Sequence, residues 1–262
     1  MAKEFTDEWR EWIRHNLQRG CSTNDIFKIL LDHSFGYDFI VSELGDQLRF
    51  FSHSAVDRPA RDGAGGSVLS GVKICGEDVQ LYLVEDFLSE TECTRLVELV
   101  KGSLRRSTIT REDEPDPDFR TSSTCDLGNL QDPLIHDVDE RICQFLGVSQ
   151  ACSEPMQGQF YSVGEQFKPH TDYFEPDELL RFAGGKGQRT WTFMIYLNEP
   201  EGGGDTQFVT LGCTVRPRPG RAVAWNNLTR DGQPNAAMLH AGTPVAAGCK
   251  VIITKWFRTR CD

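Results

Sequence analysis

Three segments near the start of the chain show the hydrophobic spacing of amphipathic helices. In the first, Trp9, Trp12, Ile13 and Leu17 fall on one face, and Thr6 stands where a helix N-cap is expected. Helices this short bury little on their own, so the module either packs on the rest of the chain or binds a partner. The three predicted helices cover residues 6–20, 22–36 and 37–44.

The pattern then changes from helices to strands. Residues 80–102 predict a strand followed by a helix, with Ser89 as N-cap and Glu92 completing a capping box. A further helix is predicted over residues 132–147. From residue 156 onward, short β-rich runs alternate with turn residues. These predicted strands cover residues 156–163, 189–198, 206–211, 212–220, 221–228, 238–245 and 249–258.

Strands that follow one another so closely leave no room for the helical crossovers of a parallel sheet. The sequence therefore predicts an α+β fold that is mainly β, with an antiparallel double-sheet barrel or jelly roll flanked by helices. A stretch rich in glycine, serine and proline indicates a linker. The expected organisation is an N-terminal helical module over 1–57, the linker over 58–71 and the main domain over 72–262.

Composition excludes several classes of protein. The formal net charge is -11 over 262 residues, which argues against an electrostatically driven nucleic-acid binder. No apolar run approaches the roughly 20 residues of a membrane span, and the first residues lack the apolar core of a signal peptide. We therefore expect a cytoplasmic protein that binds neither nucleic acid nor a membrane.

The nine cysteines are odd in number and include no CxxC pair, so zinc-site spacing is absent. In a reducing compartment we expect them to be free thiols, mostly small buried side chains. A disulfide framework is the alternative. The cysteines stand at positions 21, 75, 93, 125, 143, 152, 213, 249 and 261.

Candidate metal ligands occur at His170, Asp172 and His240. Two imidazoles and one carboxylate are the ligands that non-haem Fe(II) oxygenases use. Residues two apart on a strand point to the same face, so His170 and Asp172 would both enter a barrel. Lys250 stands in an otherwise apolar strand and needs a partner there. The turn residues of 241–249 predict a hairpin that brings Lys250 into the same barrel. Taken singly, each residue has an ordinary structural alternative, a satisfied histidine or a solvated lysine.

Over residues 79–258, the chain resembles the prolyl 4-hydroxylase group of Fe(II)/2-oxoglutarate-dependent dioxygenases. The resemblance implies a double-stranded β-helix, or jelly roll, flanked by helices. It also implies Fe(II), 2-oxoglutarate and O2 as cofactor and co-substrates, with ascorbate as a reductant. The matching segments are YLVEDFLSETECTRLVEL, FRTSSTC, FYSVGEQFKPHTDYF, GGKGQRTWTFMIYLNEPEGGGDTQF and RPRPGRAVAWNNLTRDGQPNAAMLHAGTPVAAGCKVIITKWFR.

The resemblance also assigns roles to single residues. His170, Asp172 and His240 would bind iron. Lys250 would pair with the distal carboxylate of 2-oxoglutarate, and Tyr161 would hydrogen-bond the same end. Trp256 would line the pocket, whereas Arg120 and Tyr173 would face the substrate. Each of the last four has a structural alternative: core packing for Tyr161 and Trp256, outward packing for Tyr173 and a stabilising charge pair for Arg120.

The reaction implied by the resemblance is hydroxylation of an unactivated C–H bond. Asp172 favours hydroxylation over halogenation, because related halogenases carry a small residue at that position. The expected substrate is a prolyl residue in a peptide or protein, hydroxylated at C4. Hydroxylation of a free amino acid or small natural product, and a non-enzymatic iron or 2-oxoglutarate sensor, are the alternatives. Residues 174–188 are polar and glycine-containing, and predict a mobile lid over the substrate. The oligomeric state stays open.

Overall fold

The structure is a computed structural model that describes residues 6–21, 26, 29–30, 33, 35, 72–73, 79–108, 114, 116–229 and 231–261. The first predicted helix is present as α1, Asp7–Gln18, after Thr6 at the N-cap position. The third predicted helix, the linker over 58–71 and most of the second helix lie outside the described residues. The division into three parts therefore stays a prediction.

Two antiparallel sheets dominate the described chain. The larger has the strand order β1-β2-β11-β7-β14-β5-β4-β3, and the smaller has the order β10-β9-β12-β6. The bounds in the large sheet are β1 Val72–Lys73, β2 Leu81–Val84, β3 Arg105–Arg106, β4 Ser123–Cys125, β5 Gln157–Tyr161, β7 Arg189–Tyr196, β11 Ala222–Asn226 and β14 Lys250–Arg258. Those in the small sheet are β6 Phe167–His170, β9 Thr206–Phe208, β10 Cys213–Val215 and β12 His240–Gly242. A separate pair joins β8, Gly202–Gly203, to β13, Val245–Ala247.

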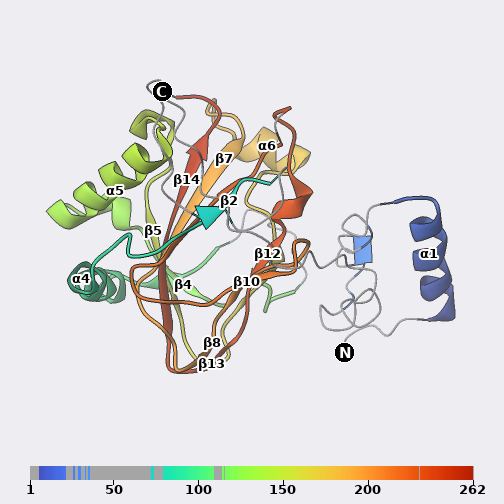
Figure 1. The fold of residues 1–262 in the computed structure, drawn as a ribbon, viewed down its shortest axis with the longest axis horizontal. Helices are drawn as coiled ribbons and strands as arrows, with labels where there is room; N and C mark the ends of the chain where they lie inside the picture. Colours follow the sequence, from blue (N-terminus) through green and yellow to red (C-terminus); the bar gives the residue numbers. More distant parts are fainter. Residues whose placement is uncertain are drawn as a thin grey trace.

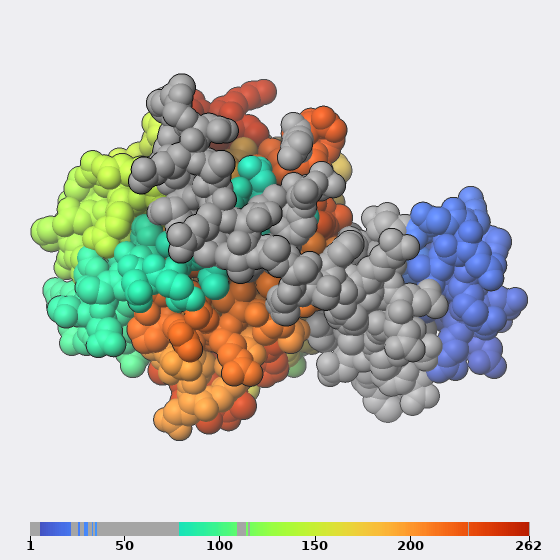
Figure 2. Space-filling model, in the orientation of Figure 1, coloured from blue at the N-terminus to red at the C-terminus, as the bar shows by residue number. Residues whose placement is uncertain are grey.

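Helices α4, Glu90–Lys101, and α5, Pro133–Leu146, cover the face of the large sheet that points away from the small sheet (Figure 1). They lie together on one side of the molecule in the space-filling view (Figure 2). The predicted capping box begins α4, since the Ser89 side chain accepts from the Glu92 N–H and the Glu92 carboxylate accepts from the Ser89 N–H. The remaining helices are α6, Pro176–Phe182, and the 3-10 turns η1 Leu127–Asn129, η2 Gln150–Cys152 and η3 Ala236–Met238.

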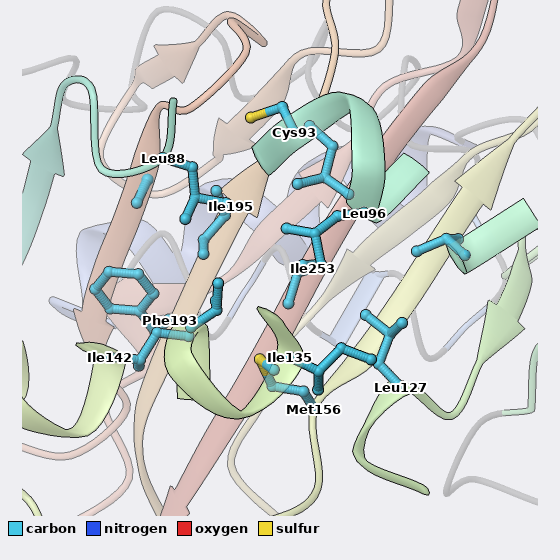
Figure 3. Packing of buried hydrophobic residues seen from close by; sticks show 14 of the residues in the cluster. Leu88, Cys93, Leu96, Leu127, Ile135, Ile142, Met156, Phe193, Ile195 and Ile253 are labelled. Atoms are coloured by element: carbon cyan, nitrogen blue, oxygen red, sulfur yellow. The ribbon is translucent and has the colours of Figure 1, made fainter. Parts of the chain in front are cut away.

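Side chains alternate between the two faces of the central strands, so each strand contributes to two separate hydrophobic cores. On β7, Phe193 and Ile195 pack toward α4 and α5, where they meet Leu96 and Ile142 (Figure 3). Met194 and the residues two apart from it turn to the opposite face and pack against the small sheet. Both faces are therefore buried along Phe193–Tyr196, and burying each large apolar side chain stabilises the fold by about 1.5–3 kcal/mol.

The N-terminal helix has its own small cluster. Ile13 of α1 packs with Ile26, Leu30 and Phe35, and the same cluster contains Val209 and Leu239 of the main body. Leu239 directly precedes β12. These contacts support the interpretation of the module as a packing appendage.

Three expectations were wrong in detail. The chain between His240 and Lys250 does not form a hairpin, because β12 pairs with β6 and β9 whereas β14 pairs with β5 and β7. The intervening β13 leaves the small sheet to pair with β8, and Gly248, with a φ of +77°, turns the chain into the large sheet.

The other two corrections concern the cysteines and Asp172. A disulfide joins Cys152 to Cys261, so not all the cysteines are free. The two meet because the chain after η2 pairs with the end of β14, through a bridge between Ser153 and Phe257. Asp172 lies just beyond the end of β6 instead of within an extended strand.

Candidate metal centre

The three predicted metal ligands meet at one end of the small sheet. His170 is the last residue of β6 and lies opposite His240, the first residue of β12, in the antiparallel register. Asp172 follows two residues after His170. One ligand atom from each of the three residues lies within 4.8 Å of the others. No other group of at least three histidine, cysteine or acidic side chains in the described part of the chain has such an arrangement.

Backbone carbonyls orient both imidazoles. The Nδ1–H of His170 donates to the carbonyl oxygen of Lys168 at 2.8 Å, and that of His240 donates to the carbonyl oxygen of Met238 at 2.9 Å. Each bond places the ring proton on Nδ1 and leaves the Nε2 lone pair free to bind a metal. The Nε2 of His240 lies 3.9 Å from Oδ2 of Asp172.

A chain of buried hydrogen bonds holds the third ligand. The Thr192 hydroxyl donates to Oδ2 of Asp172 at 2.7 Å, and the Asn227 amide donates to the Thr192 oxygen at 2.8 Å. Both Thr192 and Asn227 are fully buried. Since neither can reach water, their hydrogen bonds fix the carboxylate in one orientation.

The environment sets the protonation states that a metal requires. Burial holds the pKa of His170 well below 6.5, so its imidazole is neutral at pH 7. Burial raises the pKa of Asp172, but His240 and His170 oppose it, and the net pKa lies below the usual value. At pH 7 the site therefore offers a neutral imidazole and a carboxylate, and this donor set fits Fe(II).

Aromatic rings enclose the two imidazoles. Phe167 stacks on His170 with ring centroids 3.4 Å apart and planes 14° from parallel. Trp225 meets His240 at 4.8 Å with planes at 65°. These contacts limit ring rotation and keep water from the outer sides of the ligands.

A pocket opens beside the triad, between the two sheets. It encloses about 390 Å³, including the part open to solvent. Residues from both sheets line it, as expected for a site built on facing strands. They are Gln159, Tyr161, Phe167, His170, Asp172, Met194, Thr206, Trp225, His240, Gly242, Lys250, Ile252, Thr254 and Trp256.

Lys250 brings an unpaired positive group into this pocket. Its side chain is 2% exposed, and its Nζ lies 5.3 Å from the ring centre of Tyr161 and 5.6 Å from that of Tyr196. The residues that the structure describes provide no hydrogen-bond or ion-pair partner for this Nζ. Burial lowers the pKa of Lys250 to about 7, opposed by Asp205. A buried amine without a partner is the feature expected where an anionic ligand completes the site.

Two further residues singled out from the sequence lie in the pocket. Tyr161 lies opposite Lys250 in the register of β5 and β14, and its hydroxyl donates to Oε1 of Gln159 at 2.8 Å. Trp256 also lines the pocket, and its indole N–H is buried without a partner among the described residues. The indole N–H of Trp225, which also lines the pocket, is likewise buried without a partner among the described residues.

Arg120 and Tyr173 do not line the pocket. Arg120 donates to the carbonyl oxygen of Thr108 at 2.8 Å and lies 4.8 Å from the ring centre of Phe167, on the ring that stacks on His170. Tyr173 is 5% exposed. Their predicted contact with substrate stays a prediction.

Sequence reasoning missed the residues that support the ligands. Thr192 and Met194 on β7, and Trp225 and Asn227 on and after β11, were not singled out. Thr192, Met194 and Trp225 belong to alternating series on their strands, so the two-residue spacing used for His170 would have placed them on the inner face. What the sequence lacks is the pairing that brings β7, β11 and β14 together.

Comparisons with known proteins agree with this geometry. Residues 156–258 match the profile of the 2OG-Fe(II) oxygenase superfamily. The chain is 32% identical over 185 residues to prolyl 4-hydroxylase subunit alpha-2 of Gallus gallus and 32% identical over 179 residues to subunit alpha-1 of Homo sapiens. Each alignment covers 67% of this chain, and 33% and 34% of the two relatives. The chain thus spans about a third of the length of these relatives.

A solved structure is also similar. It is the 2OG complex of the viral collagen prolyl hydroxylase from Paramecium Bursaria Chlorella virus-1, with a TM-score of 0.56 and 26% identity. The match covers 69% of this chain and 96% of the viral chain.

No helix in the described part of this chain is long and apolar enough to cross a membrane. The profile match contains the whole triad and Lys250, and over two thirds of its length the chain is similar to prolyl 4-hydroxylases.

Proposed function

We propose that the chain is a 2-oxoglutarate-dependent dioxygenase that hydroxylates C4 of a prolyl residue in a peptide or protein, in a double-stranded β-helix. The observation that carries the proposal is the pairing of two features in one pocket: a triad suited to Fe(II) and the buried, unpartnered amine of Lys250. The facing antiparallel sheets support the proposed fold. Prolyl hydroxylases among the relatives support the substrate.

Each pocket residue has a defined task under this proposal. His170, Asp172 and His240 would hold the iron, and Lys250 would take the distal carboxylate of 2-oxoglutarate. The Tyr161 hydroxyl, beside Lys250, would donate to the same carboxylate. Together the bound iron and 2-oxoglutarate would supply the oxidising chemistry with O2, so no side chain is needed as a general base.

The pocket walls would control access and orientation. Met194, Ile252 and Trp225 give the cavity apolar surface between the two polar ends. An acid chelating the iron and paired with Lys250 would therefore have one orientation, which leaves the triad side of the pocket for substrate. Exclusion of water would strengthen the interaction of Lys250 with a carboxylate.

The test uses the purified full chain with Fe(II), 2-oxoglutarate and O2, supplied with a library of proline-containing peptides. We expect succinate formation together with a gain of one oxygen atom on proline, located at C4 by mass spectrometry and comparison with a 4-hydroxyproline standard. His170→Ala should lose both products, whereas His136→Ala, at an exposed position on α5, should keep them.

Other outcomes would redirect or refute the proposal. Succinate without peptide oxidation would refute the prolyl substrate and favour a free amino acid or another small molecule. Tight binding of metal and 2-oxoglutarate without any turnover would favour a sensor module. Absence of metal binding would refute the assignment of the triad.

A further inference from the structure

Glu154 lies outside the pocket lining but is attached to one of its walls. Its backbone N–H donates to the carbonyl oxygen of Trp256 at 2.8 Å, and its side chain is 18% exposed. Trp256 lines the pocket. Glu154 is therefore held next to a residue that lines the pocket, where the chain after η2 pairs with the end of β14.

One carboxylate holds two arginines. Glu154 accepts a bidentate pair from Arg189, with Nε to Oε1 and Nη2 to Oε2 both at 2.7 Å. It also accepts from Nη1 of Arg258 at 2.9 Å. All three side chains are largely buried. The cluster carries two positive charges and one negative charge, so Glu154 is what allows the two guanidinium groups to lie together.

Arg189 connects this cluster to the metal ligand. Its Nη1 donates to the backbone oxygen of Asp172 at 3.5 Å. Its guanidinium lies 4.2 Å from the ring centre of Trp256 and 4.7 Å from that of Phe174, two residues beyond Asp172. Arg189 therefore contacts the segment that carries Asp172 and the neighbouring wall at once.

Arg258 connects the cluster to the predicted lid. Its Nη2 donates to the carbonyl oxygens of Phe182 at 3.1 Å and Ala183 at 2.9 Å, and its Nε donates to that of Gly187 at 3.0 Å. The first two carbonyls lie at the C-terminal end of α6, where a cation is favourable. A single arginine thus anchors the far end of residues 174–188.

We propose that Glu154 is a positioning residue that fixes Asp172 and the segment 174–188 through Arg189 and Arg258. The inference rests on the proposed function only in taking Asp172 as a metal ligand. Arg189 also interacts electrostatically with Asp172 and, less strongly, with Glu178, so without the Glu154 charge Asp172 would be the carboxylate that attracts it most. Arg189 would then compete with a divalent cation for the same group, and the unbalanced guanidinium groups would repel each other.

The test measures metal affinity and the exposure of the segment separately. Mn(II) binding to the full chain is followed by electron paramagnetic resonance, and tryptic cleavage at Arg181 and Lys186 is followed by mass spectrometry. We expect Glu154→Gln to weaken Mn(II) binding by about 10- to 100-fold, the range for residues that orient metal ligands, and to accelerate cleavage. Glu154→Asp keeps the charge and should recover most of the affinity.

A matched control distinguishes this role from general loss of an ion pair. Glu85 also forms a bidentate pair with an arginine, Arg221, but away from the pocket, so Glu85→Gln should leave Mn(II) affinity and cleavage unchanged. Wild-type affinity in Glu154→Gln, or equal loss in Glu154→Asp and Glu154→Gln, would overturn the proposal. If Glu154→Gln fails to fold, the comparison of Glu154→Asp with Arg258→Gln decides, because only the second should accelerate cleavage at Arg181 and Lys186; equal cleavage would overturn the proposal.

The outcome is separable from that of the proposed function. Wild-type protein that binds no Mn(II) would refute both the metal site and the role of Glu154. Wild-type protein that binds Mn(II) yet forms no succinate would refute the dioxygenase alone, and the variants would still decide the role of Glu154.

Discussion

Replacing Lys250 with methionine should stabilise the ligand-free protein and abolish its affinity for 2-oxoglutarate. The amine is 2% exposed, and its pKa falls from 10.5 to about 7 in the folded protein. In the unfolded chain the lysine keeps its ordinary pKa. At pH 7 this difference makes folding less favourable by about 4 kcal/mol, and methionine, of similar length but uncharged, removes that penalty.

The sign of the pH dependence follows from the direction of the shift. Between pH 7 and 10.5, the unfolded state binds a proton that the folded state has released. The stability of the wild-type protein therefore rises with pH across this window through Lys250, and the contribution is absent from Lys250→Met. Urea unfolding of both proteins at about pH 7 and about pH 9 measures the stabilisation by Lys250→Met and the rise of wild-type stability with pH.

The affinity for 2-oxoglutarate should depend on pH in the opposite direction and fall as the pH rises. A carboxylate beside Lys250 favours the ammonium form, so binding above pH 7 takes up a proton. Affinity for 2-oxoglutarate should fall by up to about tenfold per pH unit above that value. Calorimetric titration of the Mn(II)-loaded protein, in buffers with different heats of ionisation, gives the affinity and the proton uptake together.

Lys255 supplies the control on the same strand. It is 1% exposed like Lys250, but its Nζ contacts Asp139 in a buried ion pair. Lys255→Met leaves Asp139 with the hydrogen bond from Gln150 but without its cation, and should destabilise the protein by about 3–5 kcal/mol, opposite in sign to Lys250→Met. An affinity for 2-oxoglutarate that does not vary between about pH 6 and about pH 9, or a Lys250→Met protein less stable than wild type, would refute the reasoning.

Three further substitutions test other parts of the structure. Thr192→Val removes the hydroxyl that donates to Asp172 and should weaken Mn(II) binding by about 10- to 100-fold, with unchanged binding as the contrary result. Cys152→Ser removes the link to Cys261 and should lower the free energy of unfolding by about 2–4 kcal/mol in urea, whereas reducing agent should then have no further effect. Gly158→Ala places a methyl group against Val100 of α4 and should lower the free energy of unfolding by about 1–3 kcal/mol. A variant as stable as the wild type would show that α4 can shift to make room.

The sequence predicted the elements better than their arrangement. Strong local signals gave α4, with its capping box, and α5, after Asp132, close to their observed bounds. The His-Asp-His triad was found because residue type and short spacing are local properties, although Asp172 lies beyond the strand on which the alternation argument placed it. The predicted hairpin after His240 was wrong because turn residues show that a chain turns and do not say which strand it meets next.

Residues that act through distant partners were beyond the reach of spacing. Asn227 and Asp172 are 55 positions apart in the sequence, and only the pairing of β11 with β7 brings the Asn227 amide to Thr192. The disulfide was missed for a similar reason, since Cys152 and Cys261 are separated by 109 positions. The composition suggested a reducing compartment, and from that we expected free thiols. Whether two thiols can pair depends on their distance in the folded chain, which composition does not give.

The place of β14 in the sheet has a consequence for synthesis on the ribosome. β14 lies between β7 and β5, yet follows both in the sequence by more than 50 residues. Until residue 258 has left the exit tunnel, the two halves of the large sheet have no strand between them, and their facing edges stay open. Such edges are sites of wrong pairing between chains. The nascent protein should therefore depend on chaperones until β14 has emerged, and it acquires Lys250, and with it a complete pocket, only with that strand.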